Sequence, residues 1–370
     1  MSQQKHKKVI ISGGGTGGHI FPAISIANAL MKIDRETEIL FVGAEGRMEM
    51  EKIPDAGYKI VGLPVAGLHR SLTLKNVLVL LKLIKSLNKA KKVIKEFEPD
   101  VVVGVGGYAS GPILRQAGKM GIPTLIQEQN SYAGVTNKLL AKRASAICVA
   151  YDGMEKYFPR EKIIRTGNPV RQNFDNLDSL HDEALTFFNL KKEFPVILVL
   201  GGSLGAGTIN NSLSENISIL RESDCQWLWQ TGKYYFENVK ALVSLSFSGN
   251  ISVHGFINRM DYAYAAADII ISRAGAGTIS ELCLVGKPAI LIPSPNVAED
   301  HQTRNAEALS SKSAAMLIAD NQAYKTLVDE AVKLISDKTR RAMFSENILK
   351  MADRNADVRI AEEVLKLATK

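Results

Sequence analysis

Seven residues near the amino terminus, GGGTGGH at positions 13–19, combine bare main chain with a titratable side chain. They follow the apolar run Val9-Ile10-Ile11 and precede Phe21-Pro22-Ala23-Ile24, which is typical of a helix start. A glycine turn between a strand and a helix brings N–H groups and the positive end of the helix close to an anion. His19 would then be placed to take a proton from a substrate hydroxyl. The alternative is a tight turn whose glycines serve packing alone.

Three further glycine-rich stretches each follow an apolar run, at residues 104–112, 201–206 and 272–281. In the first stretch, the main chain at Gly106, Gly107 and Tyr108 could donate hydrogen bonds to a second phosphorylated ligand, an acceptor. A packing turn is again the alternative.

The other two stretches add side chains to the glycines. Ser203 could contribute a hydroxyl beside main-chain donors for a diphosphate, although no Walker A pattern is present. Glu281 could accept two hydrogen bonds from the vicinal hydroxyls of a ribose. Alternatively, Glu281 lies three residues after Thr278, the spacing of a capping box in a helix that begins at Thr278.

Two polar segments follow other apolar runs. Gln302 lies in a segment that leads from a proline-containing loop into a helix, and an amide can donate to and accept from sugar hydroxyls at once. Glu128, in Glu128-Gln129-Asn130, is a second candidate general base beside His19. The sequence does not decide between these two bases.

Short β-rich runs alternate with helix-length segments along the whole chain, which predicts parallel sheets covered by helices on both faces. In such α/β sheets ligands bind beyond the carboxyl ends of the strands, where all the stretches above are expected. We predict two doubly wound domains, each with six strands: 9–11, 39–42, 59–61, 101–103, 124–126 and 146–149, then 196–200, 227–230, 251–254, 269–272, 289–292 and 315–318.

Gly167-Asn168-Pro169 predicts the boundary between the domains. We expect an N-terminal domain at 1–170 and a C-terminal domain at 171–349. The last three helical segments have no strand between them, so a terminal helix at about 350–370 could pack back onto the first domain.

The net charge of +8 is unevenly spread over the 370 residues. Residues 1–170 carry 25 Lys and Arg against 14 Asp and Glu, whereas residues 171–370 carry 21 against 24. A basic half indicates that one face meets something anionic. The three cysteines are scattered, which predicts reduced thiols in a cytosolic protein. No apolar run approaches the roughly 20 residues of a membrane-spanning helix.

Residues 56–95 contain no Asp or Glu but nine Lys and Arg. Between positions 74 and 95, leucines and an isoleucine at helical spacing alternate with lysines, which predicts a basic amphipathic helix. Such a helix could bind an anionic membrane surface. An ordinary crossover helix with a solvated lysine face is the alternative. Few aromatic residues or arginines accompany the lysines, which argues against nucleic acid.

Seven blocks occur in this order over roughly residues 8–310: GGGTGGHIFPA, GVGGYASGP, QEQN, TGNPVR, GGSLGA, SRAGAGTISE and EDHQTRNA. Together they resemble the signature blocks of the MurG family, the bacterial peptidoglycan glycosyltransferases of family 28. The resemblance implies the GT-B fold, two Rossmann-like domains with an interdomain cleft. It implies inverting transfer of N-acetylglucosamine (GlcNAc) from UDP-GlcNAc to the C4 hydroxyl of N-acetylmuramic acid in undecaprenyl-pyrophosphoryl-MurNAc-pentapeptide (lipid I), giving lipid II and UDP. It further implies a peripheral protein at the cytoplasmic face of the inner membrane, without a cofactor.

The resemblance also assigns residues to the donor. Asn130 would contact the GlcNAc moiety, Ser203 the diphosphate and Glu281 the ribose. The main chain of Ile257 would recognise uracil, and the amide of Gln302 would recognise the sugar hydroxyls. The full set of donor positions that it implies is Thr16, Gly17, Gly18, Asn130, Arg171, Ser203, Ile257, Ala276, Gly277, Thr278, Ile279, Ser280, Glu281 and Gln302.

No pair of acidic residues of the DxD type lies at a suitable place, so we expect no metal ion on the diphosphate. Oriented N–H groups at 201–206 and 275–278 would stabilise the leaving UDP instead. A UDP-GlcNAc 2-epimerase, a glycolipid glucosyltransferase and a non-catalytic nucleotide-sugar sensor are the rival functions. An NAD-dependent dehydrogenase is disfavoured, because no acidic residue closes the second strand to hold a ribose.

Overall fold

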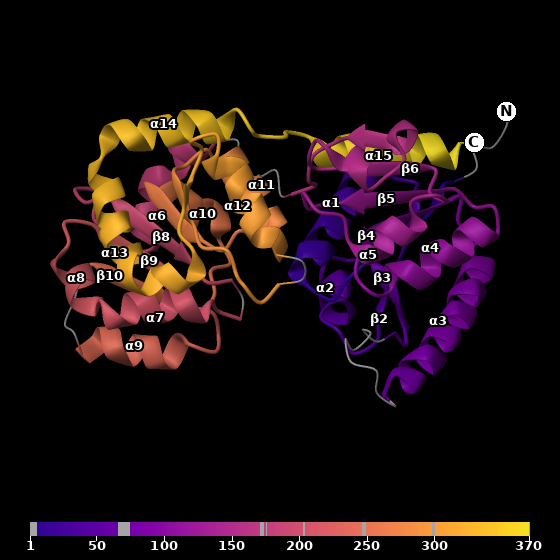
Figure 1. Cartoon of the computed structure of the whole chain (residues 1–370), viewed down its shortest axis with the longest axis horizontal. Coiled ribbons are helices and arrows are strands. Elements are labelled where there is room, and N and C mark those ends of the chain that lie inside the picture. Colours follow the sequence, from indigo (N-terminus) through magenta and orange to yellow (C-terminus); the bar gives the residue numbers. More distant parts are fainter. Residues whose placement is uncertain are drawn as a thin grey trace. The chain divides into compact units, whose positions relative to one another are not determined.

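The computed structural model describes residues 6–65, 75–170, 174, 176–202, 204–245, 249–297 and 300–369. The chain divides into two compact units. Unit 1 comprises Met1–Val170 and Arg354–Lys370, and unit 2 comprises Arg171–Asp353. In Figure 1, unit 1 is coloured from indigo to magenta, and it also includes the yellow C-terminal helix.

Within the described residues, unit 1 is built on a seven-stranded parallel sheet in the order β3-β2-β1-β4-β5-β6-β7. Six of these strands were predicted, and β7 was not. This edge strand has only three residues, none of them fully buried, so it lacks the apolar run that marks the others. The strands are β1 (Lys8–Gly13), β2 (Glu38–Ala44), β3 (Lys59–Leu63), β4 (Val101–Gly106), β5 (Thr124–Glu128), β6 (Ala146–Val149) and β7 (Ile163–Arg165).

Helices cover both faces of this sheet because successive strand residues point to opposite sides. Val9 and Ile11 pack in one core with α1 and α15, whereas Ile10 packs in another core with α3 and α4. Figure 1 shows α15 beside α1. The helices of unit 1 are α1 (Gly17–Ile33), α2 (Glu49–Asp55), α3 (Lys75–Phe97), α4 (Ser110–Lys119), α5 (Val135–Leu140) and α15 (Ala356–Ala368), with 3-10 turns η1 (Met154–Lys156) and η2 (Arg160–Lys162).

Unit 2 has a six-stranded parallel sheet over its described residues, in the order β10-β9-β8-β11-β12-β13, and all six strands were predicted. They are β8 (Val196–Leu200), β9 (Gln226–Gln230), β10 (Ile251–His254), β11 (Ile269–Ser272), β12 (Ala289–Leu291) and β13 (Met316–Leu317). The helical elements are η3 (Leu177–Leu180), α6 (His181–Phe187), α7 (Gly207–Glu215), α8 (Ile217–Glu222), α9 (Phe236–Leu245), α10 (Met260–Ala266), α11 (Ala276–Val285), α12 (His301–Ser310), α13 (Asp320–Ser336) and α14 (Lys338–Leu349).

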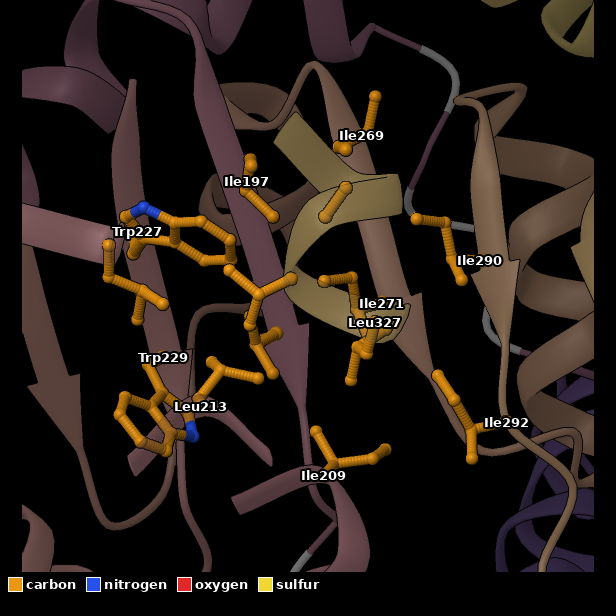
Figure 2. Packing of buried hydrophobic residues seen from close by; sticks show 14 of the residues in the cluster. Ile197, Ile209, Leu213, Trp227, Trp229, Ile269, Ile271, Ile290, Ile292 and Leu327 are labelled. Carbon is orange, nitrogen blue, oxygen red and sulfur yellow. The ribbon is translucent and has the colours of Figure 1, made fainter. Parts of the chain in front are cut away.

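One face of the second sheet forms a core with α7 and α13. Figure 2 shows Trp227 of β9 beside Ile197 of β8, and Trp229 of β9 beside Leu213 of α7, with Leu327 of α13 in the same cluster. Both tryptophans of the chain are therefore buried in unit 2.

The three cysteines are free thiols and all are buried, as predicted for reduced residues. Burial raises the pKa of Cys148 and of Cys283 to about 12, and it also raises the pKa of Cys225. These thiols stay protonated near neutral pH and do not act as nucleophiles. Over the described part of the chain, no helix combines the length and apolar character that crossing a membrane requires.

The last helix contributes buried side chains to unit 1, and Arg359 of this helix donates to the carbonyl of Thr166 through Nε (3.2 Å) and Nη2 (2.6 Å). Ile360→Ala should lower the free energy of unfolding of unit 1 by about 2–5 kcal/mol, because it leaves a cavity under α15. In urea, the far-UV circular dichroism transition should move while the tryptophan fluorescence transition, which reports unit 2, stays in place. Glu362→Ala, at an exposed position of the same helix, is the matched control. Equal stability of the two variants would contradict this packing role.

Candidate functional site

The glycine turn after β1 leads directly into α1. The helix begins at Gly17, with Thr16 as its N-cap residue, and not at Phe21 as predicted. Glycine is a poor helix former, so propensity placed the start too late; tertiary contacts of the turn override it. Thr16, Gly17 and Gly18 thus lie at the N-terminus of a helix, where unpaired N–H groups attract anions.

His19 lies in the first turn of α1, and its side chain is half-buried. Nδ1 lies 3.1 Å from the carbonyl oxygen of Gly14 and 3.5 Å from Thr16 Oγ1. A carbonyl oxygen can only accept, so Nδ1 carries the proton and Nε2 carries the lone pair. On the other side of the ring, a Cβ on Gly106 would lie 2.7 Å from Nε2. The imidazole is therefore held between two glycines in the tautomer that can accept a proton at Nε2.

A buried carboxylate lies beneath the same turn. Glu49, at the start of α2, is 0% exposed. The N–H of Gly15 donates to Oε2 (2.9 Å) and the N–H of Ala44 donates to Oε1 (3.0 Å). A Cβ on Gly14 would lie 2.1 Å from Oε1, and a Cβ on Gly43 would lie 2.6 Å from Cγ. Only glycine fits at these two positions while Glu49 keeps its place.

The second glycine stretch of unit 1 packs against the first. Gly107 has φ +87°, and a Cβ on it would lie 2.4 Å from the carbonyl oxygen of Gly14. Ser110 Oγ donates to the carbonyl of Gly107 (2.8 Å), and α4 begins at Ser110 with Pro112 in its first turn, as predicted. Tyr108 is 56% exposed between them. The candidate acceptor residues therefore lie next to the turn that carries His19.

Glu128, the other candidate base, ends β5 and is buried. Oε1 accepts from the N–H and the side-chain amide of Asn130 (3.1 and 3.3 Å). Oε2 accepts from the N–H of Gly134 (3.0 Å) and the amide of Asn137 (2.9 Å). Four donors thus engage this carboxylate, which fixes the loop after β5 and the orientation of Asn130.

In unit 2 the glycine turn after β8 interlocks with the turn after β9. The N–H of Gly201 donates to the carbonyl of Gln230 (3.0 Å). A Cβ on Gly205 would lie 2.5 Å from the carbonyl oxygen of Thr231, and one on Gly232 would lie 2.2 Å from the nitrogen of Gly205. Because α7 begins directly after this turn, its first N–H groups lie at the same edge of the sheet.

Ile257, predicted to present its main chain, is buried after β10. Its N–H donates to Oε1 of Gln230 (2.9 Å), which is itself buried. A ligand that meets the main chain of Ile257 would therefore meet its carbonyl oxygen.

The turn after β11 is shorter than predicted. The helix α11 begins at Ala276 with Gly275 as N-cap, so the start predicted at Thr278 is wrong, and so is the capping box. Glu281 instead accepts a hydrogen bond from the hydroxyl of Tyr264 (3.1 Å), a residue that is 1% exposed. Helix propensity could not find the true start because Ala276 and Gly277 fit a loop as well as a first helical turn.

Gln302, in the first turn of α12, anchors two neighbouring turns. Its Oε1 accepts from the N–H of Ala274 (3.3 Å) and from the N–H of Ser294 (2.9 Å). With the oxygen directed at main-chain donors, the amide nitrogen is the end that can donate to a ligand.

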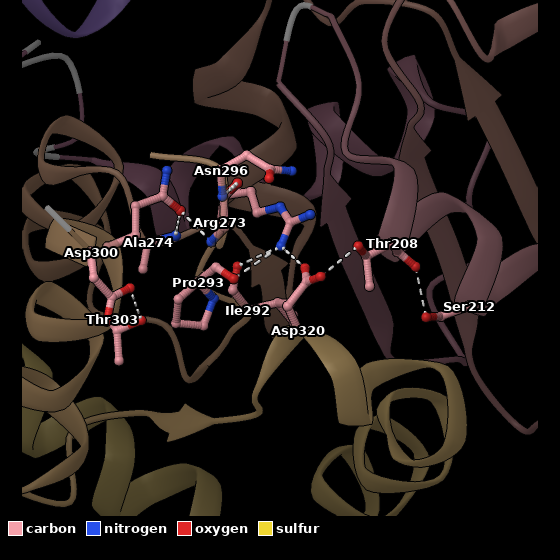
Figure 3. Close-up of polar contacts among 12 residues, drawn as sticks. Thr208, Ser212, Arg273, Ala274, Ile292, Pro293, Asn296, Asp300, Thr303 and Asp320 are labelled. Carbon is pink, nitrogen blue, oxygen red and sulfur yellow. Dashed lines mark hydrogen bonds and ion pairs between the residues drawn. The ribbon is translucent and has the colours of Figure 1, made fainter. Parts of the chain in front are cut away.

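A charged network joins the turns after β11 and β12 to the first turns of α7 and α13 (Figure 3). Arg273 Nη1 donates to the carbonyls of Ile292 and Pro293, each at 3.2 Å, and to Asp320. Thr208 Oγ1 donates to the other oxygen of Asp320 (3.0 Å). Arg273 and Asp320 are 20% and 22% exposed in their side chains, so their pairing is largely shielded. The network fixes α7, the turn after β11 and the turn after β12 relative to one another.

Two predicted donor residues, Arg171 and Ser203, lie outside the described residues. Among the residues that the structure does describe, no group of three or more His, Cys, Asp or Glu side chains could hold a metal ion.

The sequence did not reveal Glu49, Tyr264, Gln230 or Asp320 as parts of the site. Glu49 carries no distinguishing signal, since Glu51 follows it on the same short helix and is exposed. Tyr264 lies on α10, outside every glycine-rich stretch of the sequence. Only burial and contacts across the fold identify such residues.

Two family models and several similar proteins match this chain, and they point to the same family. The model described as the glycosyltransferase family 28 N-terminal domain matches residues 9–149, and the one described as the glycosyltransferase family 28 C-terminal domain matches residues 196–361. A curated protein of Parabacteroides distasonis is 58% identical over 363 residues, 98% of this chain and 99% of that protein. One of Bacteroides thetaiotaomicron is 58% identical over 367 residues, 99% of each.

Both curated proteins are named UDP-N-acetylglucosamine--N-acetylmuramyl-(pentapeptide) pyrophosphoryl-undecaprenol N-acetylglucosamine transferase. Among solved structures, MurG of Acinetobacter baumannii matches with a TM-score of 0.77 and 27% identity, over 97% of this chain and 99% of that chain. The calicheamicin glycosyltransferase CalG4, at 14% identity and a TM-score of 0.69, shares the fold.

The interlocked glycine turns of unit 2 generate a stability prediction. Gly232→Ala and Gly202→Ala both place a side chain at positive φ, +80° and +74°, but nothing lies within 4 Å of a Cβ on Gly202. Left-handed strain of about 1–2 kcal/mol is common to both variants. Gly232→Ala also meets the nitrogen of Gly205, and should lose about 1–3 kcal/mol more. Urea unfolding followed by tryptophan fluorescence measures the difference, and equal losses would contradict the interlocking.

Proposed function

This chain belongs to glycosyltransferase family 28, and we propose that it transfers GlcNAc from UDP-GlcNAc to the C4 hydroxyl of N-acetylmuramic acid in undecaprenyl-pyrophosphoryl-MurNAc-pentapeptide, with inversion. The products are lipid II and UDP. The observation that carries this function is 58% identity, over 98% of the chain or more, to two transferases named for it. The predicted fold class, GT-B, is confirmed by the match to a solved MurG.

Unit 2, Arg171–Asp353, contains the proposed donor domain, residues 171–349. The diphosphate of UDP would meet the N-termini of α7 and α11, which supply N–H donors and the positive ends of two helices. As the glycosidic bond breaks, negative charge grows on the β-phosphate, and dipoles already aimed at it lower the barrier. Ser203 and Arg171, which lie outside the described residues, remain proposed donor contacts.

The ribose, the uracil and the sugar of the donor are each proposed to meet a group of unit 2. The hydrogen bonds described above fix the orientation of these groups. The carboxylate of Glu281, held by Tyr264, is proposed to accept from the ribose hydroxyls. The carbonyl of Ile257 would accept from uracil N3–H, because its N–H is engaged by Gln230. The amide nitrogen of Gln302 would donate to the sugar hydroxyls.

The helix that carries Glu281 supplies the other proposed contacts of the nucleotide. Ala276, Gly277 and Thr278 form its first turn, so their N–H groups have no acceptor within the helix and can point at a phosphate. Ile279 and Ser280 complete the proposed set.

Unit 1 is the proposed acceptor domain, residues 1–170 with the C-terminal helix. His19 is our proposed general base, because its Nδ1–H is fixed on Gly14 and its lone pair is on Nε2. Glu128 is less suited, since four hydrogen-bond donors already engage its oxygens.

Three further groups of unit 1 are proposed ligand contacts. The main chain at Gly106, Gly107 and Tyr108 would meet the acceptor. Thr16, Gly17 and Gly18, at the N-terminus of α1, would contact the donor, as would Asn130, whose amide is oriented by Glu128.

We propose that α3 binds the protein to the cytoplasmic face of the inner membrane as a peripheral protein. In the part of α3 whose side chains are described, Leu81, Leu83 and Ile84 are 51%, 43% and 50% exposed. Exposed lysines surround them, with Lys89 paired to Glu45. Apolar side chains that enter the lipid interface beside lysines at the anionic surface would provide the binding. Position 74, included in the predicted helix, lies outside the described residues.

The function is tested by incubating the purified protein with UDP-GlcNAc and a short-chain lipid I analogue in EDTA. We expect GlcNAc transfer to the analogue and release of UDP without a divalent ion. His19→Ala should lower turnover at least about tenfold, since a general base typically contributes about 10²–10⁴-fold, while the Kd for UDP-GlcNAc stays unchanged.

His6→Ala, an exposed histidine that pairs with Glu36, is the matched control and should keep full turnover. Conversion of UDP-GlcNAc alone into UDP-ManNAc would indicate a 2-epimerase instead. Donor binding without transfer in the wild type would indicate a sensor. Full turnover by His19→Ala would remove His19 from the mechanism, and loss of activity in EDTA would overturn the metal-independent donor site.

Membrane binding is tested with a variant in which Lys82, Lys85, Lys89 and Lys92 are replaced by Glu. Each lysine near an anionic surface adds about 1 kcal/mol, so partition onto phosphatidylcholine–phosphatidylglycerol vesicles should fall about a hundredfold or more. The control replaces four exposed lysines of unit 2, Lys240, Lys325, Lys338 and Lys350, by Glu. It makes the same change in net charge, so equal losses in both variants, or none in the first, would refute the role of α3.

A further inference from the structure

A single peptide group, between Gly14 and Gly15, connects the buried carboxylate of Glu49 to the imidazole of His19. The N–H of Gly15 donates to Glu49 Oε2 at 2.9 Å, and the carbonyl of Gly14 accepts from His19 Nδ1 at 3.1 Å. These two groups, the C=O of one residue and the N–H of the next, are the two ends of one planar peptide unit. Glu49, the peptide and His19 therefore form a continuous chain of hydrogen bonds.

The local sequence leaves the plane of this peptide open, and the carboxylate holds its N–H end in one direction. Gly14 and Gly15 have no side chains, and Gly15 has φ +86° with nothing within 4 Å of a Cβ. A glycine pair of this kind can adopt many orientations, so a fixed partner is needed to hold one. Glu49 is 0% exposed and is itself fixed, because its second oxygen accepts from the N–H of Ala44.

Polarisation adds to the orientation. A carboxylate that accepts from one end of a peptide makes the carbonyl at the other end a stronger acceptor, since hydrogen bonds in a chain strengthen one another. A stronger acceptor at Gly14 holds the proton on Nδ1 of His19 and stabilises the imidazolium that forms when Nε2 takes a proton. This is the task that a carboxylate in direct contact with a histidine performs, carried out here through one peptide group.

We propose that Glu49 is a positioning residue for His19, acting through the Gly14–Gly15 peptide. The inference rests on the proposed function, in which His19 is the general base. Glu49 contacts neither donor nor acceptor in this scheme. Its replacement should therefore lower kcat without changing donor binding, and only while His19 is present.

The test is a double-mutant cycle with Glu49→Gln, which keeps the shape but removes the charge. Glu49→Gln alone should lower kcat about tenfold or more while the Kd for UDP-GlcNAc stays unchanged. In the His19→Ala background the same substitution should change kcat by less than about twofold, because residues that act through one another are not additive. Glu51→Gln, an exposed residue on the same helix, should match the wild type in both backgrounds.

Nitrogen-15 spectra of the six histidines provide a readout that does not depend on turnover. At a pH where His19 is neutral, the wild type should show the Nδ1–H tautomer for His19. Glu49→Gln should shift His19 toward the Nε2–H tautomer, because a neutral amide accepts from the Gly15 N–H more weakly than a carboxylate and so makes the Gly14 carbonyl a weaker acceptor for Nδ1–H. If Glu49→Gln does not fold, Gly43→Ala replaces it: its Cβ would lie 2.6 Å from Glu49 Cγ, so it displaces the carboxylate but keeps the charge. Gly43→Ala should give the same pattern in kcat and tautomer.

Equal losses of kcat in the two backgrounds would overturn the proposal, because they would show a structural role independent of His19. An unchanged tautomer in the variant that folds would overturn it as well. If the wild type transfers no GlcNAc, the proposed function fails, and the tautomer spectra still decide whether Glu49 controls His19. The two failures are therefore distinguishable.

Discussion

Close contact between bare main-chain segments at the carboxyl ends of the strands is the constraint on which the site depends. In unit 1, a Cβ on Gly107 would lie 2.4 Å from the carbonyl of Gly14, and in unit 2 a Cβ on Gly232 would lie 2.2 Å from the nitrogen of Gly205. No side chain fits in either place. The turns can therefore stack on one another, and their N–H and C=O groups become available to partners that a side chain would keep away.

The partners that use this access are two buried carboxylates and one half-buried amide. Glu49, Glu128 and Gln302 each direct oxygens at main-chain N–H groups of a neighbouring turn. Hydrogen bonds from N–H groups to a carboxylate are among the stronger ones, and they compensate for removing the charge from water. Each such residue fixes the turns and leaves a specific neighbour, such as His19 or Asn130, in one orientation. The polar residues beneath the turns therefore determine the geometry of the groups that are proposed to meet substrate.

Much of the fold follows from the sequence, because parallel strands buried on both faces are nearly continuous apolar runs. Twelve strands were located this way, and β7 was not, since three partly exposed residues give no such run. Helix starts at Gly17 and Ala276 were placed late, because intrinsic propensity treats glycine as a breaker while the fold needs it at the first turn.

For the candidate site, residue type singled out His19 and the glycine turns, since few residue types can exchange a proton near neutral pH or leave the main chain uncovered. Residue type alone could not show that Glu49, and not Glu51 two residues later on the same short helix, lies beneath the turn. The difference between them is burial, which arises from where α2 lies against the glycine turn. The same limit applies to Tyr264, whose hydroxyl reaches Glu281 only because α10 and α11 are neighbours in space.

The charge distribution between the two halves of the sequence bears on where each ligand is proposed to bind. Residues 171–370 hold 21 basic against 24 acidic side chains, yet this half is the proposed site of a diphosphate. Helix N-termini resolve the apparent conflict, because the partial charges of oriented N–H groups bind an anion without any net positive charge. Arg273 supports the same conclusion, since its guanidinium is engaged by Asp320 and two carbonyls and so aligns the turns. The basic excess lies instead in residues 1–170, where α3 is proposed to meet the anionic membrane and the acceptor carries its own pyrophosphate.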